Sequence, residues 1–319
     1  MCGIVGYLGY RQAAEVCMEG LLRLEYRGYD SFGIATVSPE IAVFKETGKI
    51  SAAKDSVHLK GTCGIGHTRW ATHGVPSRTN AHPFTDCTGK IAVVHNGIIE
   101  NYAALKRDLE KRGHTFVSET DTEVIPHLIE EKYTGNLREA VSKILPLLEG
   151  AYAILVIAEG TEEIVAARKG SPLVLGVGDR EYVFASDGLP ILDYTRKVIY
   201  LEDGDLAEVT PAGYTIYQGK KPVERKVATL EWDAADVRKG GFAHYMLKEM
   251  YEQPEVFSNT INSITENAAA LCRIRDARSI TIVACGTSAN ASTVFAYLME
   301  SICGIPTRVV LASEFKYFP

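Results

Sequence analysis

The sequence lacks the features of a membrane-bound or exported protein. No apolar stretch in its 319 residues reaches the roughly 20 residues that a membrane-spanning helix needs. The amino end has no basic segment, and Gly3, Gly6 and Gly9 interrupt what would be the apolar core of a signal peptide. We therefore expect a cytoplasmic protein that does not associate with a membrane.

Long basic runs and closely paired cysteines are also missing. The net charge of -6 and the isoelectric point near 5.8 argue against nucleic acid as the main partner, because binding phosphates requires a basic surface. The seven cysteines are scattered and form no Cys-x-x-Cys pair. This pattern is typical of reduced thiols and not of a disulfide framework or a zinc site.

The histidines give no clear metal signature. His67, His73, His82 and His95 lie close in sequence, but their spacing matches no ligand pair on one helix, and no cysteine ligand accompanies them. We predict hydrogen-bonded histidines in loops, no bound metal and no cofactor.

The order of expected elements predicts an α+β first domain over residues 2–219. A strand over Gly3–Leu8 and a helix over Gln12–Tyr26 come first. Helices are then predicted over Tyr102–Arg112, Thr122–Tyr133 and Leu137–Leu148, the second with Thr120 and Asp121 as candidate N-caps. Short strands separated by Gly, Asp and Pro fill residues 151–218, which predicts mainly antiparallel pairing and a layered sandwich with helices outside.

A second domain is predicted after a charged linker at residues 220–241, which ends in two glycines. A helix from His244, interrupted at Pro254, precedes a strand over Ser279–Ala284, a helix over Ser288–Ile302 and a strand over Thr307–Leu311. This order indicates one βαβ unit of a parallel sheet. Because such a sheet needs more than two strands, we expect residues 242–319 to form an incomplete domain.

Cys2 is the first candidate for chemistry. A thiol is strongly nucleophilic only as the thiolate, and an α-amino group with a pKa near 8 can serve as its base once Met1 has been removed. Taken alone, a cysteine at this position is better explained as a buried structural residue. Polar blocks that follow apolar runs farther along the chain favour the catalytic interpretation.

Other residues in these blocks suit attack on the amide of an amino acid. The Asn96 side chain and the Gly97 backbone N–H could stabilise an oxyanion. Arg69 could bind an α-carboxylate, and Asp121 could pair with an α-ammonium. Without Cys2, each has a simpler explanation: a turn at Asn96-Gly97, a surface cation at Arg69 and a helix cap at Asp121.

These blocks together resemble the class II glutamine amidotransferase family, over essentially the whole chain. The matching segments are Met1–Gly6, Tyr26–Ser31, His67–Gly74, Asn80–Pro83 and His95–Asn101. Leu24–Ser31 and Glu119–Val124 are most similar to the branch that uses fructose 6-phosphate as acceptor, and less similar to the phosphoribosyl or asparagine branches.

The resemblance implies an N-terminal-nucleophile hydrolase fold, an αββα sandwich, followed by the start of a sugar isomerase (SIS) domain. It implies that Cys2 hydrolyses L-glutamine through a γ-glutamyl thioester and that the ammonia reaches D-fructose 6-phosphate to make glucosamine 6-phosphate. It assigns the oxyanion hole to Asn96 and Gly97, and glutamine binding to Arg69, Thr72, His73 and Asp121. Trp70 becomes the gate of an ammonia channel, and the full-length protein is expected to be a homodimer.

The second domain carries a weaker signal. The segment Ala284–Ser288 ends a strand and opens a helix, where backbone N–H groups and hydroxyls favour a phosphate. On the sequence alone, a plain glycine turn with a serine N-cap is the better explanation. By resemblance, Gly286, Thr287 and Ser288 belong to part of the sugar-phosphate site. The later family segments, including a second SIS domain and a C-terminal lysine, are absent here. We therefore expect a truncated chain that is competent only as a glutaminase.

Two alternatives remain open. The chain could be an inactive relative that senses a sugar phosphate, which a substitution at Cys2, Asn96 or Asp121 would favour; all three residues are present. It could also carry the glutaminase domain of another class II amidotransferase, against which the SIS-like segment counts.

Overall fold

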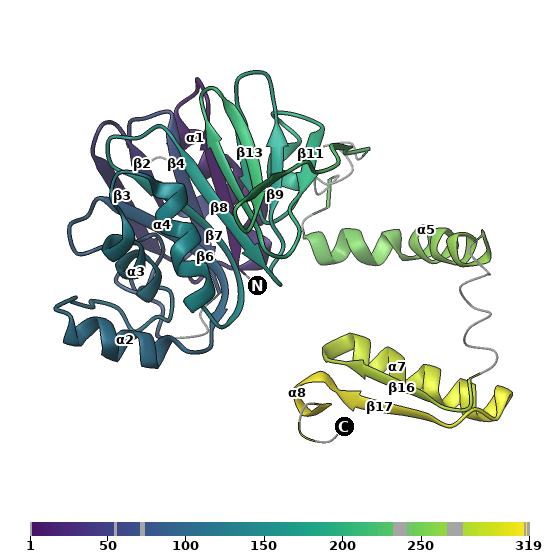
Figure 1. The fold of residues 1–319 in the computed structure, drawn as a ribbon. Coiled ribbons are helices and arrows are strands. Elements are labelled where there is room, and N and C mark those ends of the chain that lie inside the picture. Colours follow the sequence, from purple (N-terminus) through teal and green to yellow (C-terminus); the bar gives the residue numbers. More distant parts are fainter. Residues whose placement is uncertain are drawn as a thin grey trace. The chain divides into compact units, whose positions relative to one another are not determined.

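A computed structural model describes residues 2–53, 56–70, 74–231, 241–242, 244–266, 277–315 and 317. The chain divides into two units, Met1–Arg238 and Lys239–Pro319. The first unit consists of two stacked β-sheets with helices on their outer faces (Figure 1). This arrangement is the predicted αββα sandwich.

Both sheets of the first unit pair their strands antiparallel. The eight-stranded sheet has the order β15 (Ala228–Thr229), β11 (Lys197–Tyr200), β9 (Val174–Val177), β10 (Tyr182–Ala185), β1 (Gly3–Leu8), β4 (Cys63–Arg69), β2 (Ser31–Val37) and β3 (Ile41–Thr47). The seven-stranded sheet has the order β14 (Lys221–Val223), β13 (Gly213–Gln218), β12 (Asp205–Thr210), β8 (Ile164–Lys169), β7 (Gly150–Ala158), β6 (Ile91–Ile99) and β5 (Phe84–Thr85).

Side-chain alternation along β1 explains why its whole length is apolar. Ile4 and Leu8 enter the core between the two sheets, whereas Val5 and Tyr7 enter the core between the sheet and helix α1 (Ala13–Leu24). Successive side chains of a strand point to opposite faces, so a strand covered on both faces needs apolar residues throughout. The strand that follows Cys2 is therefore buried on both sides.

Helices α2 (Tyr102–Lys111), α3 (Val124–Lys132) and α4 (Leu137–Ile144) cover the seven-stranded sheet. Helix α1 covers the other sheet and continues into a 3-10 turn over Glu25–Arg27. Further 3-10 turns lie at Ile50–Ala52, Leu145–Leu147 and Leu189–Ile191.

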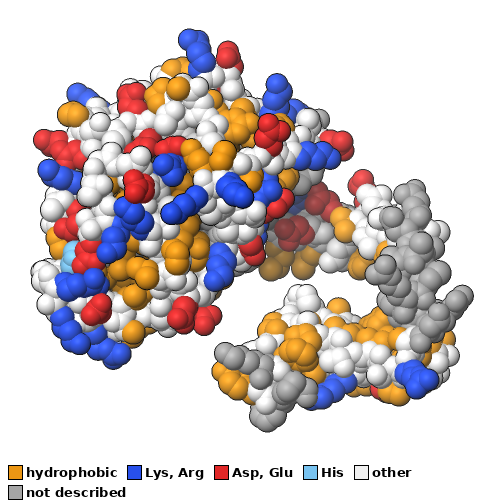
Figure 2. Space-filling model, in the orientation of Figure 1, with side chains coloured by type: hydrophobic (Ala, Val, Ile, Leu, Met, Phe, Trp, Pro, Cys, Tyr) orange, Lys and Arg blue, Asp and Glu red, His pale blue; other side chains and the backbone are white. Residues whose placement is uncertain are grey.

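The second unit contains the predicted parallel pair. Strand β16 (Ile280–Ala284) pairs in parallel with β17 (Thr307–Leu311). Helix α7 (Gly286–Leu298) and a π-helical turn over Met299–Cys303 connect the two strands. Helices α5 (Tyr245–Glu266) and α8 (Ala312–Phe315) lie before and after this segment. Many hydrophobic side chains of the unit are exposed (Figure 2), including Phe257, Ile261, Val294, Tyr297 and Leu298.

Two sequence-based expectations differ from the structure. Helix α5 is continuous through Pro254 and is not interrupted there. Proline removes one N–H, but the rest of this 22-residue helix keeps its bonding pattern, and the Ser258 hydroxyl donates to the Pro254 carbonyl at 2.9 Å. Within the expected linker, β14 and β15 pair with β13 and β11 of the first unit.

Across the helices that the structure describes, none combines the length and apolar character needed to cross a bilayer.

Candidate active site

Cys2 immediately precedes β1, which lies between β10 and β4 in the middle of its sheet. Its Sγ atom is 3.3 Å from the backbone nitrogen of Trp70 and 3.5 Å from the Trp70 carbonyl oxygen. Ladder hydrogen bonds on both sides hold β1, so the position of this thiol is determined by the sheet.

The electrostatic environment of the Cys2 thiol is mixed. Burial raises its pKa, because the thiolate loses hydration. The Trp70 N–H, the chain amino terminus and the positive charge of Arg69 act in the opposite direction, whereas Asp121 adds to the increase. Thiolate formation therefore depends on a base close to Sγ.

Asn96 lies on β6 and is held from two sides. Its Nδ2 donates to the Cys2 carbonyl oxygen at 3.3 Å, and its Oδ1 lies 3.1 Å from His67 Nε2. Because Oδ1 is occupied by the His67 ring, the NH₂ group is directed toward residue 2. This orientation places a neutral donor beside the candidate nucleophile.

Gly97 follows Asn96 in a conformation that other residues avoid. Its φ angle is 136°, and a Cβ atom there would lie 1.9 Å from the Ala151 carbonyl oxygen. Only glycine permits this close contact between β6 and β7.

Arg69 and Asp121 supply opposite charges next to Cys2. Both are nearly fully buried, at 3% and 5% exposure. Arg69 donates to the Gly74 carbonyl oxygen at 3.1 Å, and Asp121 accepts from the Ile99 N–H at 2.8 Å. Burial lowers the pKa of the Arg69 guanidinium, while the charges of Cys2, Asp121 and Asp30 raise it.

The Asp121 contact corrects the expected role of this residue as a helix cap. Helix α3 begins at Val124, and its N-cap is Glu123, without a side-chain cap bond. The Asp121 carboxylate instead bonds the backbone of β6, a strand more than twenty positions earlier in sequence. Thr120 is also not the cap; its hydroxyl bonds Ser118 at 2.9 Å.

A small cavity brings most of these side chains together. Its lining residues are Cys2, Arg69, Trp70, His82, His95, Gly97, Thr120, Asp121 and Thr122. Five of these residues had been selected from the sequence, namely Cys2, Arg69, Trp70, Gly97 and Asp121. Asn96 reaches the same place through its bond to the Cys2 carbonyl.

Trp70 is 45% exposed at the edge of this cavity and packs edge-to-face on Tyr29, with ring centroids 5.8 Å apart. The segment that carries Tyr29 lies against the Arg69–Trp70 backbone. A Cβ atom on Gly28 would come within 2.8 Å of Trp70 N, and the Asp30 N–H donates to the Arg69 carbonyl at 3.1 Å. The Tyr26–Ser31 motif therefore supports the Arg69–Trp70 segment that lines the cavity.

Three buried histidines lie at the site: His82 and His95 line the cavity, and His67 contacts Asn96. His67 and His82 stack with centroids 3.9 Å apart, and His95 Nδ1 lies 2.9 Å from the Thr122 hydroxyl. Burial lowers the pKa of all three, that of His67 to about 3, and the neighbouring histidines lower those of His67 and His82 further. At neutral pH these rings are uncharged, so they orient neighbours by hydrogen bonds.

The remaining predicted residues belong to the second unit or lie outside the described residues. Thr72 and His73 belong to the latter group. Gly286, Thr287 and Ser288 are exposed at the start of α7, whose N-cap is Cys285 and not a serine.

Sequence reasoning missed Ser186, which anchors the strand that follows Cys2. The Ile4 N–H donates to the Ser186 hydroxyl, and the Ser186 N–H donates to the Ile4 carbonyl, both at 3.1 Å. No local pattern marks a serine whose partner lies 182 positions away.

Family models match both parts of the chain. The glutamine amidotransferase domain matches residues 67–193, and the SIS domain matches residues 273–319. The chain is 48% identical over 328 residues to a glutamine–fructose-6-phosphate aminotransferase (isomerizing) of Thermus thermophilus, covering 99% of this chain and 54% of that protein. It is 50% identical over 325 residues to the protein of the same name from Methanothermobacter thermautotrophicus, covering 99% and 55%.

The chain therefore contains a glutamine amidotransferase domain followed by the beginning of an SIS domain. It spans about half the length of the curated relatives that it matches.

Solved structures of the amidotransferase fold agree with this assignment. The allosteric regulatory enzyme of purine biosynthesis has a TM-score of 0.61 and 30% identity, covering 69% of this chain and 49% of that chain. The glutamine phosphoribosylpyrophosphate amidotransferase of B. subtilis, solved with ADP and GMP, also has a TM-score of 0.61, with 23% identity, covering 97% and 65%. The latter supports the fold alone.

Proposed function

We propose that this chain hydrolyses L-glutamine at Cys2. The observation that carries the proposal is a thiol one residue from the amino end, in a cavity that also contains Arg69 and Asp121. A zwitterionic amino acid presents a carboxylate and an ammonium, and these two side chains supply a complementary pair of charges.

The reaction requires that Met1 be removed. The freed α-amino group of Cys2 then takes the thiol proton, and Sγ attacks the side-chain carbonyl carbon of glutamine. The negative charge that develops on the carbonyl oxygen is stabilised by Asn96 Nδ2 and the Gly97 N–H. Asn96 Nδ2 lies 3.3 Å from the Cys2 carbonyl oxygen, and this position beside residue 2 supports the role of Asn96 as an oxyanion donor.

Collapse of the tetrahedral intermediate breaks the C–N bond. The α-ammonium of Cys2 returns its proton to the leaving nitrogen, so ammonia departs and a γ-glutamyl thioester remains. A water molecule, deprotonated by the same amine, then attacks the thioester carbon. The C–S bond breaks, glutamate is released, and the ammonium returns the proton to the departing thiolate. Thr72 and His73 are proposed to help bind glutamine, and Trp70 to gate the path of ammonia.

For the longer protein, we propose the reaction named for its relatives, in which the ammonia converts fructose 6-phosphate to glucosamine 6-phosphate. Gly286, Thr287 and Ser288 would contribute to its sugar-phosphate site. A second domain over residues 242–319, a homodimeric state and a cytoplasmic location are part of the same proposal, with a linker that begins after β15 and not at residue 220.

Covalent labelling tests the nucleophile. The chain is incubated with a glutamine-like electrophile, and the peptides are analysed by mass spectrometry beside an ammonia-release assay. We expect one adduct, on a peptide that begins at Cys2 without Met1, and loss of ammonia release in proportion to labelling. The variant Cys2→Ser should lose both signals. Labelling at Cys63 or the exposed Cys87, with Cys2 unmodified, would refute the mechanism.

A further inference from the structure

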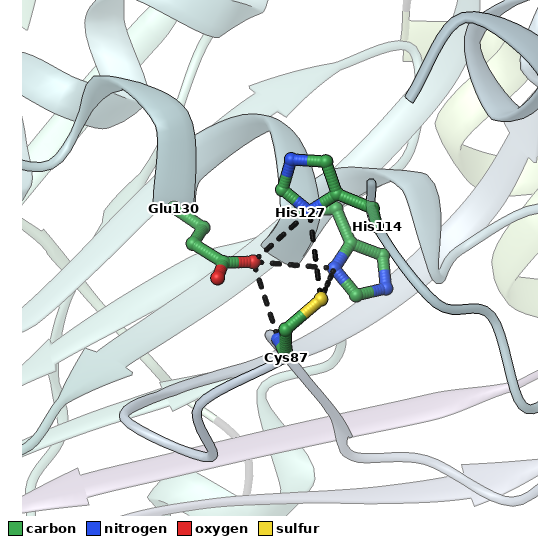
Figure 3. Close-up of side chains that lie close together, drawn as sticks. All are labelled: Cys87, His114, His127 and Glu130. Carbon is green, nitrogen blue, oxygen red and sulfur yellow. Dashed lines mark hydrogen bonds and ion pairs between the residues drawn. The ribbon is translucent and has the colours of Figure 1, made fainter. Parts of the chain in front are cut away.

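A cluster of sulfur, nitrogen and oxygen ligands lies outside the candidate active site (Figure 3). It consists of Cys87, His114, His127 and Glu130, each of which offers one ligand atom within 4.8 Å of the others. Cys87 Sγ is 3.5 Å from Nδ1 of both histidines, and Glu130 Oε2 is 3.2 Å from His114 Nδ1 and 3.4 Å from His127 Nδ1.

Four of the six distances between these ligand atoms match edges of a tetrahedron of zinc ligands, and all six are within 4.8 Å. With zinc bonds of about 2.3 Å to sulfur and 2.0–2.1 Å to nitrogen or oxygen, tetrahedral geometry separates sulfur from nitrogen by about 3.5 Å and nitrogen from oxygen by about 3.3 Å. Four edges between the ligand atoms fall within about 0.2 Å of these values. We propose that Cys87, His114, His127 and Glu130 bind one Zn²⁺ ion.

The outer nitrogen of each ring faces a carboxylate, within hydrogen-bond distance for His114 and beyond it for His127. His114 Nε2 is 3.4 Å from Glu131 Oε1, and His127 Nε2 is 3.9 Å from Glu123 Oε1. A histidine that binds metal through one nitrogen commonly directs the other N–H at a carboxylate, which fixes the ring and strengthens the ligand. Both histidines therefore point Nδ1 inward and Nε2 toward an acidic side chain.

Three separate segments build this cluster. Cys87 lies in the turn between β5 and β6, where the Gly89 N–H donates to the Asp86 carbonyl at 3.2 Å. His114 follows α2. His127 and Glu130 are three residues apart on α3, a spacing that places both on one face of a helix.

Ligand chemistry favours zinc over harder cations. One thiolate and two imidazoles suit zinc and similar transition metals, whereas magnesium and calcium prefer oxygen ligands. A thiolate and a carboxylate balance the charge of a divalent ion. Cys87 is exposed, which gives the ion a path of entry.

Four protein ligands leave no open position, so the ion has a structural role. It joins the β5–β6 turn and the segment after α2 to α3, which begins three residues after Asp121. Metal binding thus stabilises the element next to the candidate glutamine site. This inference does not depend on the proposed function.

Metal analysis of the full chain tests the site. The protein is stripped with a chelator, reconstituted with Zn²⁺ or Co²⁺, and freed of excess ion. We expect one ion per chain, a raised melting temperature by about 5 °C or more, and a cobalt spectrum with a sulfur-to-metal charge-transfer band and intense four-coordinate absorption.

Matched variants separate this site from adventitious binding. Cys87→Ser should abolish the charge-transfer band, and His127→Gln should lower the zinc affinity, whereas Cys303→Ser and His58→Gln, at exposed positions, should change neither. Glu131→Gln should weaken zinc binding by about 10- to 100-fold. The proposal is overturned if the folded wild-type chain retains no ion, if its cobalt spectrum lacks the sulfur band, or if His127→Gln binds as tightly as wild type.

Discussion

The orientation of the Asn96 side chain is fixed by one contact on each side of its amide. His67 Nε2 binds Oδ1, and Nδ2 donates to the Cys2 carbonyl. We predict that Asn96→Ala lowers kcat for glutamine hydrolysis by about 10²- to 10³-fold, because one oxyanion donor is lost. Steady-state ammonia release at saturating glutamine measures this effect.

The control is an asparagine with a different function. Asn136 caps α4, and its Oδ1 accepts from the Glu139 N–H at 2.7 Å. Asn136→Ala should cost about 1 kcal/mol of unfolding free energy and leave kcat unchanged. A kcat for Asn96→Ala close to that of Asn136→Ala would contradict the proposed donor role.

The buried histidines predict a pH dependence of stability. The folded pKa of His67, about 3, lies below the value near 6.5 of an unfolded chain, and those of His82 and His95 are also lowered. Below about pH 6.5 the unfolded state binds more protons, so stability is fully present above this pH and is lost as pH falls toward the folded pKa. Each ring contributes a slope of up to about 1.4 kcal/mol per pH unit.

Denaturant titrations between pH 5.0 and 6.5 test this expectation. His82→Gln should reduce the slope of unfolding free energy against pH, whatever its effect on absolute stability, because one buried ring no longer titrates. His58→Gln, at an exposed position, should leave the slope unchanged. Equal slopes in the wild type and His82→Gln would show that the folded ring binds protons as readily as the unfolded one, which would contradict the lowered pKa.

At the scale of elements, the contact between β6 and β7 at Gly97 limits substitution. With φ at 136° and a Cβ position 1.9 Å from the Ala151 carbonyl oxygen, Gly97→Ala must displace one strand. We expect it to destabilise the protein by more than the roughly 1–2 kcal/mol of a left-handed alanine alone. Gly160→Ala, at φ of 73° with nothing within 4 Å, measures that smaller cost in thermal unfolding.

The limits of sequence-based prediction are visible in the elements near the site. Periodicity gave strand β1 and helices α1 to α4 within a few residues, because burial on one or two faces leaves a local pattern. Of the two roles considered for Asp121, the helix cap is wrong, because its carboxylate accepts from the Ile99 N–H on β6. The zinc ligands escaped notice because three segments supply them, although His127-x-x-Glu130 was readable on its own.

At the scale of the molecule, the first unit has its own cores. Two sheets and their covering helices enclose three hydrophobic clusters within Met1–Arg238. A shortened chain ending at Arg238 should therefore fold alone and release ammonia with a kcat within about threefold of the 319-residue chain. Ammonia assays and circular dichroism on both chains test this. A folded but inactive short chain would show that residues 239–319 complete the glutaminase.

The αββα architecture was predicted through resemblance more than through physics. Alternation and turn residues indicated a layered antiparallel sandwich, but the strand order, with β1 between β10 and β4, depends on long-range pairing. The same pairing brings Cys2, Arg69 and Asp121 to one cavity. The sequence was enough to select these three residues by the chemistry of their side chains. That they meet in one cavity could be seen only in the folded chain.

The central position of β1 has a practical consequence for producing the protein. The strand begins at Gly3, one residue after Cys2, and is buried along its whole length. An affinity tag fused to the amino end would convert the free amine that the proposed mechanism requires into a peptide bond. Purification handles therefore belong at the carboxyl end, or behind a protease site whose cleavage leaves cysteine first.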